Sequence, residues 1–582
     1  MSFSLPKDAV KRVNIGHSFA EYDEQLKNPY VFVKTPATMS AVDRSRGHCF
    51  FVGRRGTGKT ATSLIATSTF GKNSEVILPQ FFSALGAALN PASLRDTRQR
   101  PFKSLVTAFK RSILDEAYSV WERNGIFRYS EYDSTLSKEK QYIEDFDFEE
   151  RCAHFIDDIF EVSRDHQIKE WSRRLHRVQD LENAAVENID GGDVVTILID
   201  RLDESWDGSE KSVVVLMALM HACVELNASE APIRVLLFLR ENIFARVRDA
   251  DNEFARIETW IVSLEWSRED LIELVERRLV QNFTAKPQLH GPTWDLFFEP
   301  WDGNPSWQYI LDFCLARPRD VLTFCSFAVQ SAQAHHHTRI LVEDVQFARQ
   351  QFSDSRLKDL GDEYAENFPQ IQLVLARFHG LGYRFSMTGI EDLIKKLIVD
   401  SEIARHCKWV YAVTSPAQFI ELFYNIGFFG VTNGGQSTYR SSGASGSAFP
   451  VLSQSSEVVV HPSYRDALGL QPIVVTRLAA DLRLQTEGLK LDLPENIGID
   501  EYTERLNTMR DEFGRLPTGS EHSAIFEELV GDLVKFCFYN VLTNVQPHAR
   551  TVGNTEVRDW IASNRAEIAS GNGSGISSTP VK

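Results

Sequence analysis

The chain has 582 residues, of which 43% are hydrophobic and 25% are charged, and its formal net charge is −17. These proportions are typical of globular proteins, and the length predicts three or four domains. The negative charge excludes a protein that coats nucleic acid over its whole surface, although a local basic face stays compatible with it.

Neither a membrane segment nor a secretory leader is evident in the sequence. No apolar run approaches the roughly 20 residues that span a bilayer, and Met1–Val13 lacks the apolar stretch of a leader. The seven cysteines include no C-x-x-C pair, which favours buried free thiols in a reducing compartment. We therefore expect a cytoplasmic protein with no membrane partner.

The N-terminal half is predicted to contain an α/β core. We expect a polar lead-in over residues 1–47, then the core over residues 48–266 with a helical insertion at about 80–190. Val194–Ile199 and Ile233–Leu239 are uninterrupted apolar runs, typical of strands that are buried on both faces. Strands that alternate with helices predict a three-layered parallel sheet.

A phosphate-binding pattern, G-x-x-x-x-G-K-[ST], runs from Gly53 to Thr60 between an apolar strand and a helical segment. Its glycines let backbone N–H groups point inward around a phosphate, and the helix N-terminus adds partial positive charge. Lys59 can reach the β- and γ-phosphates, and the Thr60 hydroxyl can ligate Mg²⁺. The pattern predicts a site for ATP and Mg²⁺, against the alternative of a chance glycine-rich turn. The residues assigned to the nucleotide are Gly53, Arg54, Arg55, Gly56, Thr57, Gly58, Lys59, Thr60 and Ala61.

An acidic segment follows the run Val194–Ile199. Asp200 comes directly after it, where a phosphate loop needs an acid, and we expect Asp200 and Thr60 to be the protein's ligands to Mg²⁺. Asp203 or Glu204 could orient or deprotonate the attacking water, and the sequence does not choose between them. The alternative is an exposed acidic turn after a buried strand.

Arg240 follows the next apolar run, Ile233–Leu239. Because ligands of parallel sheets bind beyond the carboxyl ends of the strands, Arg240 is predicted to face the γ-phosphate and to report its presence. The alternative is a surface arginine paired with Glu241 or another nearby acid.

Residues 267–360 have the spacing of helices and are predicted to form a helical lid. Within them, Arg317-Pro318-Arg319-Asp320 is typical of a helix start, with proline in the first turn and an acid near the dipole. One of the two arginines could lean onto the nucleotide, and a solvated, capped helix start is an equal alternative.

Residues 361–470 combine helical segments with a short hairpin and a Gly/Ser-rich stretch around 442–447, which resembles a winged helix. DNA contact and protein docking are both open for this part, because its basic residues are few and lie among acids. Lys395, Lys396, Arg405, Lys408 and Arg440 contribute positive charge to this part.

Residues 471–569 are predicted to be helical, followed by a disordered tail over 570–582. One alternative is a degenerate half of a PD-(D/E)xK nuclease core, with a glutamate of the pair Glu527-Glu528 on a helix and Asp559 on a strand. That metal chemistry needs a further E-x-K motif, which the sequence after Asp559 lacks.

Taken together, the segments GRRGTGKT, ILIDRLDE, FLREN and RPRD resemble the STAND and AAA+ branches of P-loop NTPases. The D-x-x-D-E form of the second segment is closer to STAND proteins, although Arg201 stands where these usually have a small residue. RPRD is similar to the lid-domain sensor of replication-initiator AAA+ proteins, which places Arg319 at the nucleotide. The order of motifs over residues 15–470 also resembles an uncharacterised family of bacterial P-loop ATPases, which implies a role in DNA repair or phage defence.

The first functional hypothesis is an ATP-hydrolysing switch in which Arg240 and Arg319 couple the γ-phosphate to the position of the lid. The second is a nucleotide-gated scaffold with little turnover that recruits a partner. The third is a DNA-stimulated motor or loader. The resemblance also implies self-association into a homo-oligomer.

Overall fold

A computed structural model describes residue 6 and residues 8–45, 47–80, 85, 100–127, 145–160, 177–284, 293–413, 415–440, 449–475, 499–516, 522–537, 542–550 and 557–564. The predicted Gly/Ser-rich stretch at 442–447 and the predicted tail at 570–582 lie outside these residues. The chain divides into two compact units. The first comprises Met1–His379 and Lys395–Leu470, and the second comprises Gly380–Ile394 and Gln471–Lys582.

The first unit contains a five-stranded sheet with the strand order β2-β3-β4-β1-β5, in which every neighbouring pair is parallel. The fold is therefore mixed α/β with a parallel sheet, as the alternation of strands and helices predicts. The strands are β1 (Phe50–Gly53), β2 (Ser74–Ile77), β3 (Val195–Ile199), β4 (Ile233–Arg240) and β5 (Ile261–Ser263).

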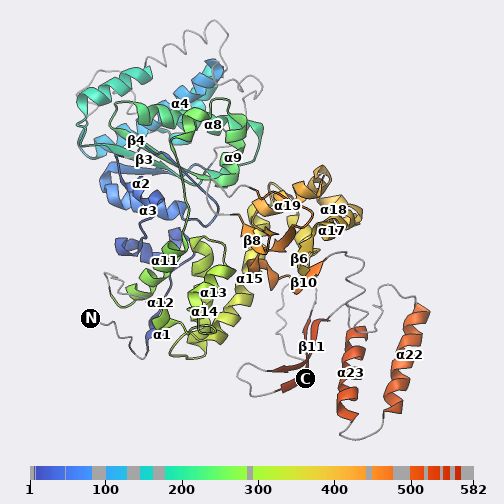
Figure 1. The fold of residues 1–582 in the computed structure, drawn as a ribbon. Helices are drawn as coiled ribbons and strands as arrows, with labels where there is room; N and C mark the ends of the chain where they lie inside the picture. Colours follow the sequence, from blue (N-terminus) through green and yellow to red (C-terminus); the bar gives the residue numbers. More distant parts are fainter. Residues whose placement is uncertain are drawn as a thin grey trace. The chain divides into compact units, whose positions relative to one another are not determined.

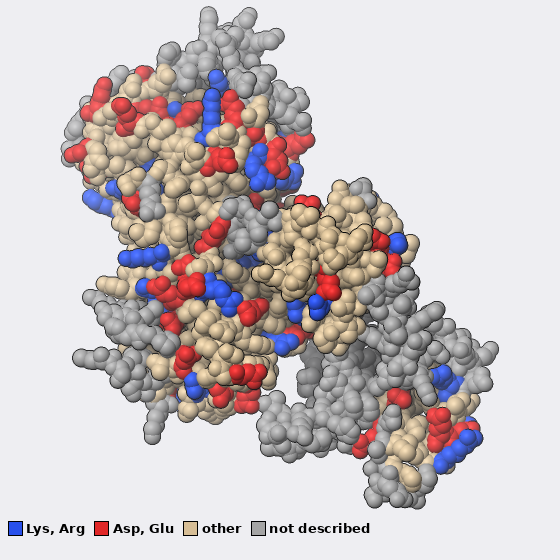
Figure 2. Space-filling model, viewed as in Figure 1, with Lys and Arg blue, Asp and Glu red and all other residues tan. Residues whose placement is uncertain are grey.

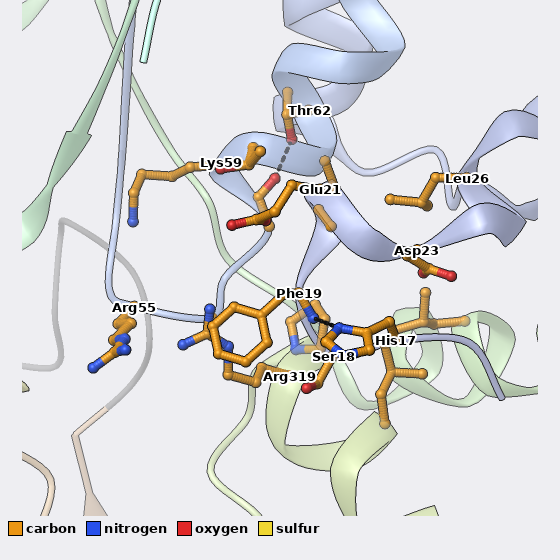
Figure 3. Close-up of a pocket in the computed structure, with 18 of the residues that line it drawn as sticks. His17, Ser18, Phe19, Glu21, Asp23, Leu26, Arg55, Lys59, Thr62 and Arg319 are labelled. Atoms are coloured by element: carbon orange, nitrogen blue, oxygen red, sulfur yellow. Dashed lines mark hydrogen bonds between the residues drawn. The ribbon is translucent and has the colours of Figure 1, made fainter. Parts of the chain in front are cut away.

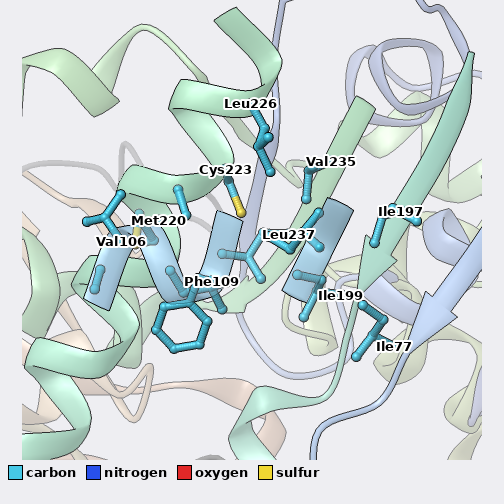
Figure 4. Close-up of a cluster of buried hydrophobic side chains, with 14 of the residues drawn as sticks. Ile77, Val106, Phe109, Ile197, Ile199, Met220, Cys223, Leu226, Val235 and Leu237 are labelled. Carbon is cyan, nitrogen blue, oxygen red and sulfur yellow. The ribbon is translucent and has the colours of Figure 1, made fainter. Parts of the chain in front are cut away.

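Helices cover both faces of this sheet (Figure 1). Alternate residues of each strand point to opposite faces, so Leu236 and Phe238 of β4 pack towards α2 and α3. Val235 and Leu237 pack on the other side with α4 and α8, as Figure 4 shows. The helices around the sheet are α2 (Pro36–Val42), α3 (Lys59–Phe70), α4 (Arg100–Arg123), α6 (Phe148–Phe160), α8 (Glu210–Ala228), α9 (Glu241–Ala250) and α10 (Ala255–Glu258).

Helix α8 is long and apolar enough to cross a membrane, and among the described residues it is the only helix that is. In the structure, 67% of its apolar stretch is buried. Residues such as Met220 and Cys223 lie in the same hydrophobic core as the sheet (Figure 4). The core therefore accounts for the apolar composition of α8.

A helical part follows the sheet and has a hydrophobic core of its own. Its helices are α11 (Arg268–Gln281), α12 (Trp294–Phe297), α13 (Ser306–Phe313), α14 (Pro318–Ala334) and α15 (Val342–Tyr364). That this part acts as a lid remains a prediction.

Residues 8–35, here called the N-terminal strap, belong to the helical core although the whole α/β part separates them from it in the sequence. Val10, Val13, Ile15 and Val33 of the strap are buried in that core. The polar lead-in predicted for residues 1–47 is therefore a packed element. Its short helices are α1 (Ala9–Arg12), η1 (Ala20–Tyr22), η2 (Glu24–Lys27) and η3 (Pro29–Val31).

The end of the first unit contains helices followed by antiparallel strands, in which β7 pairs with both β8 and β9. Buried phenylalanines such as Phe423 and Phe429 lie between the helices and the strands. The winged-helix identity of this part remains a prediction. Its elements are α16 (Ile371–Ala376), α18 (Ser401–His406), α19 (Pro416–Asn425), β7 (Phe429–Asn433), β8 (Gln436–Tyr439), β9 (Glu457–Val460) and α20 (Pro462–Arg465).

The second unit differs from the helical region predicted for residues 471–569. It contains α22 (Ile499–Arg515) and α23 (Ser523–Cys537), but β11 (Leu542–Arg550) and β12 (Val557–Asn564) form an antiparallel pair where helix was expected. Pro547 and the β-branched residues of these segments favour strand over helix, which explains the error. Glu527 lies on α23 and Asp559 on β12, and the nuclease-like alternative stays a prediction. The remaining elements are β6 (Gly382–Ser386) and β10 (Gln471–Val475), which pair in parallel, and α17 (Met387–Val399), within which the chain passes between the units.

Candidate nucleotide site

The loop between β1 and α3 has the backbone that its glycines were predicted to allow. Gly56 and Gly58 have φ angles of 83° and 94°, in the left-handed region that favours glycine. A Cβ atom at Gly53 would lie 2.4 Å from the Thr57 Oγ1 atom, so the turn also needs glycine there. The spacing of the three glycines therefore follows from the geometry of the turn.

The carbonyl groups of this loop are held by donors around it. Arg317 donates to the Arg55 carbonyl at 2.9 Å, the Arg319 N–H donates to the Gly56 carbonyl at 3.2 Å, and Trp266 Nε1 donates to the Thr57 carbonyl at 2.8 Å. The first i→i−4 bond at this end of α3 runs from the Thr62 N–H to the Gly58 carbonyl at 2.9 Å, so the N–H groups from Gly58 to Ala61 have no partner within the helix and are available to an anion. We call this loop the phosphate cradle, because it is the candidate site for the phosphates of a nucleotide.

The Lys59 side chain rests against the loop. Its Nζ atom donates to the carbonyls of Gly53 at 3.0 Å and Arg54 at 3.1 Å. Burial lowers the pKa of Lys59 to about 8, with Asp203 opposing and Arg240 reinforcing the effect. A bound phosphate would place negative charge next to the ammonium group and would therefore oppose this lowering of the pKa.

Asp200 and Thr60 lie together, as the Mg²⁺ prediction requires. The Thr60 side chain hydrogen-bonds to Asp200, and the Arg201 N–H donates to Asp200 Oδ1 at 2.9 Å. Asp200 is 3% exposed, and burial raises its pKa against the lowering effects of Arg201, Lys59 and Thr60. A carboxylate and a hydroxyl are the oxygen ligands that Mg²⁺ prefers, and a cation would stabilise this buried carboxylate. The residues therefore fit the ion.

Asp203 and Glu204 both line the cavity, but their surroundings differ. Asp203 forms an ion pair with Arg240 and its side chain is 15% exposed, whereas the side chain of Glu204 is 62% exposed. Arg201, between these acids and Asp200, has a φ of 61° and lies 3.8 Å from both Glu21 and Glu204. The structure thus brings Asp203 and Arg240 together and leaves the Glu204 side chain largely exposed to solvent.

Arg319 enters the cavity from the N-terminus of α14. Its guanidinium lies 4.3 Å from the centre of the Phe19 ring, and Figure 3 shows the two side chains next to each other at the cavity that Lys59 also lines. Among the described residues, Nε and Nη1 of Arg319 are buried without a hydrogen-bond partner. Burial lowers its pKa to about 10. An unpaired buried guanidinium is suited to an anion.

The side chain of Arg54 is not among those that line the cavity, so a contact of Arg54 with the nucleotide would have to come from its main chain. Six of the nine assigned residues line the cavity, namely Arg55, Gly56, Gly58, Lys59, Thr60 and Ala61. The Arg54 side chain instead leaves the loop on the other side, where it donates to the Ile426 carbonyl. Gly53 and Thr57 pack against each other within the turn, where the Thr57 hydroxyl donates to the Arg54 carbonyl. Adjacent residues of a turn point in different directions, so a motif does not assign the side chain of each member.

The cavity continues beyond the loop and has a volume of about 350 Å³. Its phosphate end is formed by the loop and the ends of β3 and β4. Its apolar end is formed by the strap and the helical part, and the sequence did not predict it. The apolar side chains at this end are Leu26, Val31, Val33, Leu274 and Leu322.

The strap is fixed at this end by a buried ion pair. Arg278 of α11 donates to Asp23 at 2.6 Å and to the Ile15 carbonyl at 3.0 Å, and both charged side chains are at most 4% exposed. Partners more than 250 positions apart leave no local pattern. The one signal available was the set of apolar residues inside an otherwise polar lead-in.

The chain is similar to several known proteins. Residues 269–361, which run from α11 to α15, match the family described as the FunZ-associated C-terminal helical domain. The chain is 24% identical to the Escherichia coli protein named "Putative transposon gamma-delta 80.3 kDa protein", over 94% of this chain and 80% of that protein. A solved structure described as Drosophila ORC bound to DNA covers 80% of this chain and 92% of that chain at 13% identity. Its TM-score is 0.26, a value that supports no conclusion about fold or function.

A further relative is the Alternaria alternata protein named Allergen Alt a 2. The two are 30% identical over 146 residues, which make up 25% of this chain and 77% of that protein. By this match, the chain belongs to the same protein family as Allergen Alt a 2 of Alternaria alternata.

Proposed function

We propose that the chain is an ATPase of the P-loop type that uses Mg²⁺. The observation that carries the proposal is the phosphate cradle, in which the carbonyls of Arg55, Gly56 and Thr57 are held from outside. With these carbonyls engaged there, the inward N–H groups would bind phosphate oxygens, and Lys59 would exchange its contacts with the Gly53 and Arg54 carbonyls for phosphate oxygens. In a chance glycine-rich turn, we would not expect three successive carbonyls to be bound by donors from outside the loop.

In the proposed reaction, a water molecule attacks the γ-phosphorus, and the bond between that phosphorus and the β–γ bridging oxygen breaks. The products are ADP and inorganic phosphate, and the proton of the water passes to Glu204 or Asp203. Lys59, Arg240 and Arg319 stabilise the negative charge that spreads over the transferring group. Mg²⁺, held by Thr60 and Asp200, would neutralise charge on the β- and γ-oxygens.

The apolar end of the cavity suits the base of a nucleotide. It lies across the same cavity from the loop, and its lining is aliphatic, with Phe19 and Arg319 between the two ends. The cavity volume of about 350 Å³ falls within the range of small-molecule sites. We propose that the base is held between the strap and α11, and the phosphates by the loop.

The wider role that we propose is a STAND- or AAA+-type switch in DNA maintenance or phage defence. The transposon named in the Escherichia coli relative supports a connection with DNA. On the face shown in Figure 2, basic and acidic side chains are interspersed over the described residues, so that face offers no basic stripe. DNA would therefore bind locally, for which the part with α19 and β7–β9 is the proposed element.

Measuring nucleotide binding and turnover by the purified chain, with and without duplex DNA, tests the proposal. We expect ATP to bind with Mg²⁺ and to be hydrolysed. Turnover that DNA does not alter supports the switch, and turnover that DNA stimulates supports a motor or loader. Binding without turnover supports a nucleotide-gated scaffold, and absence of binding contradicts all three.

A further inference from the structure

We propose that Arg54 is a positioning residue that couples the nucleotide site to the packing of residues 415–440 and 449–470, here called the wing segment. The inference rests on the proposed function, because it concerns how a bound nucleotide acts on the rest of the first unit. Arg54 belongs to the phosphate loop by sequence. Its side chain contacts the wing segment, whereas its neighbour Arg55 lines the cavity.

The side chain of Arg54 is held by the wing segment and by the end of α15. Its Nη2 atom donates to the Ile426 carbonyl at 2.6 Å and to the Tyr364 hydroxyl at 3.3 Å. Arg54 is 5% exposed, and a Cβ atom at Gly427 would lie 2.9 Å from its Nη1 atom. The wing segment therefore encloses this guanidinium with backbone at close range, and a larger residue at position 427 would displace it.

The backbone of Arg54 contacts the residue that meets the nucleotide. Its carbonyl accepts from Lys59 Nζ at 3.1 Å and from the Thr57 hydroxyl at 2.8 Å. When Lys59 turns towards a phosphate, the Arg54 carbonyl loses one of these donors. Arg54 is thus in contact with the nucleotide-sensing lysine through its main chain and with the wing segment through its side chain.

A second pair joins the same two regions. Glu241 directly follows Arg240, which faces the cavity, and it forms an ion pair with Arg440 at the end of β8. Both pairs line a cleft of about 500 Å³ between α9, the end of α15 and α19. The side chain of Arg54, a member of the phosphate loop, therefore lies in this cleft. So does that of Glu241, which directly follows Arg240.

Coupling of this kind is reciprocal. If a nucleotide loosens the contact of Arg54 with the wing segment, then whatever draws the wing segment away lowers nucleotide affinity by the same factor. A hydrogen bond from a charged donor, lost within a buried contact, changes such an equilibrium about tenfold. We therefore expect an ATP analogue to loosen the wing segment about tenfold.

Hydrogen exchange of the full chain, with and without a slowly hydrolysed ATP analogue, tests the inference. In the wild type, we expect the analogue to slow exchange in α3 and to speed exchange of α19 and β7 about tenfold. In Arg54→Met, α3 should still be protected, while the effect on α19 and β7 should fall below about twofold. Arg256→Met replaces an exposed arginine of the same α/β core and should behave as the wild type.

The outcomes separate the inference from the proposed function. If the analogue leaves α3 of the wild type unprotected, the nucleotide proposal fails. If α3 is protected but exchange of α19 and β7 does not change, or changes equally in Arg54→Met, the inference is wrong. A purely structural role of Arg54 would alter exchange equally with and without the analogue. Should Arg54→Met fail to fold, Tyr364→Phe removes only the second acceptor, and it must reduce the effect of the analogue for the inference to stand.

Discussion

The two ends of the candidate cavity are built in different ways. The phosphate end consists of residues that follow the strands β1, β3 and β4 directly, so each group lies within a few positions of an apolar run. The apolar end joins the strap to α11 and α14, across some 250 positions of sequence. Groups that carry phosphate chemistry are thus fixed by local geometry, whereas the apolar end depends on how distant segments pack. Variants at the phosphate end should therefore lose phosphate binding and turnover, whereas variants at the apolar end should lose stability and affinity for ATP.

The largest effect is expected at the phosphate end. Lys59→Ala removes the charge that would meet the β- and γ-phosphates, and it should abolish turnover and weaken the binding of both ATP and pyrophosphate on the order of 100-fold. Calorimetry with each ligand measures this loss. Lys72→Ala, which replaces an exposed lysine after α3, is the matched control and should bind both ligands normally. Equal binding by Lys59→Ala and Lys72→Ala would contradict the assignment.

The second prediction concerns the base that accepts the proton of water. Glu204 is the more exposed acid, and Asp203 is paired with Arg240, so we expect Glu204→Gln to lower kcat by about 10²–10⁴-fold and to leave ATP binding intact. Asp203→Asn should weaken ATP binding as well, because it releases Arg240. Single-turnover kinetics and binding measurements on both variants decide this. Full turnover by Glu204→Gln would assign the base to Asp203.

The third prediction addresses the apolar end. Arg278→Met leaves the carboxylate of Asp23 buried without its partner, and it should destabilise the fold by about 3–5 kcal/mol. Since the strap is then loosened, ATP should bind more weakly, while pyrophosphate, which needs only the phosphate end, should bind as before. Thermal unfolding and calorimetry measure the two effects. Arg268→Met breaks an exposed pair with Asp312 in the same helical part and should cost less than about 1 kcal/mol. If Arg278→Met lost the same affinity for ATP and for pyrophosphate, the assignment of the base to the apolar end would be wrong.

The smallest effect is a pH dependence. The pKa of Lys59 is lowered to about 8 by burial, and a bound phosphate would raise it again. At pH 8 about half of the free sites then lack this proton, so nucleotide binding should take up about half a proton and should weaken as pH rises above 8. Calorimetry in buffers of different ionisation enthalpy detects the uptake. Uptake that persists in Lys59→Ala would show that another group titrates.

The sequence predicted the backbone of the loop and the strands that precede Asp200 and Arg240, because their signals are local. The glycine spacing anticipated the φ angles of Gly56 and Gly58, and the apolar runs before Asp200 and Arg240 correspond to β3 and β4. The parallel α/β sheet followed from the same pattern. These are properties that a few consecutive residues determine through backbone conformation and burial.

Other features could not be predicted in this way. Nothing near Arg54 in the sequence indicates that its side chain reaches Ile426, and Asp23 and Arg278 meet only after the helical core has packed. The pair β11–β12 differs, because Pro547 is a local signal against helix, but only the pairing of the two segments identifies them as strands. In each case tertiary packing decided between local alternatives.

Arg201 has a consequence for how relatives of this chain can be recognised. Its left-handed φ of 61° costs roughly 1–2 kcal/mol in a residue other than glycine, so the backbone of this turn would favour glycine. Here the guanidinium lies within 3.8 Å of Glu21 in the strap and of Glu204, contacts that a small residue could not make. A sequence profile that penalises a long side chain at this position would score such chains too low, although their backbone keeps the turn.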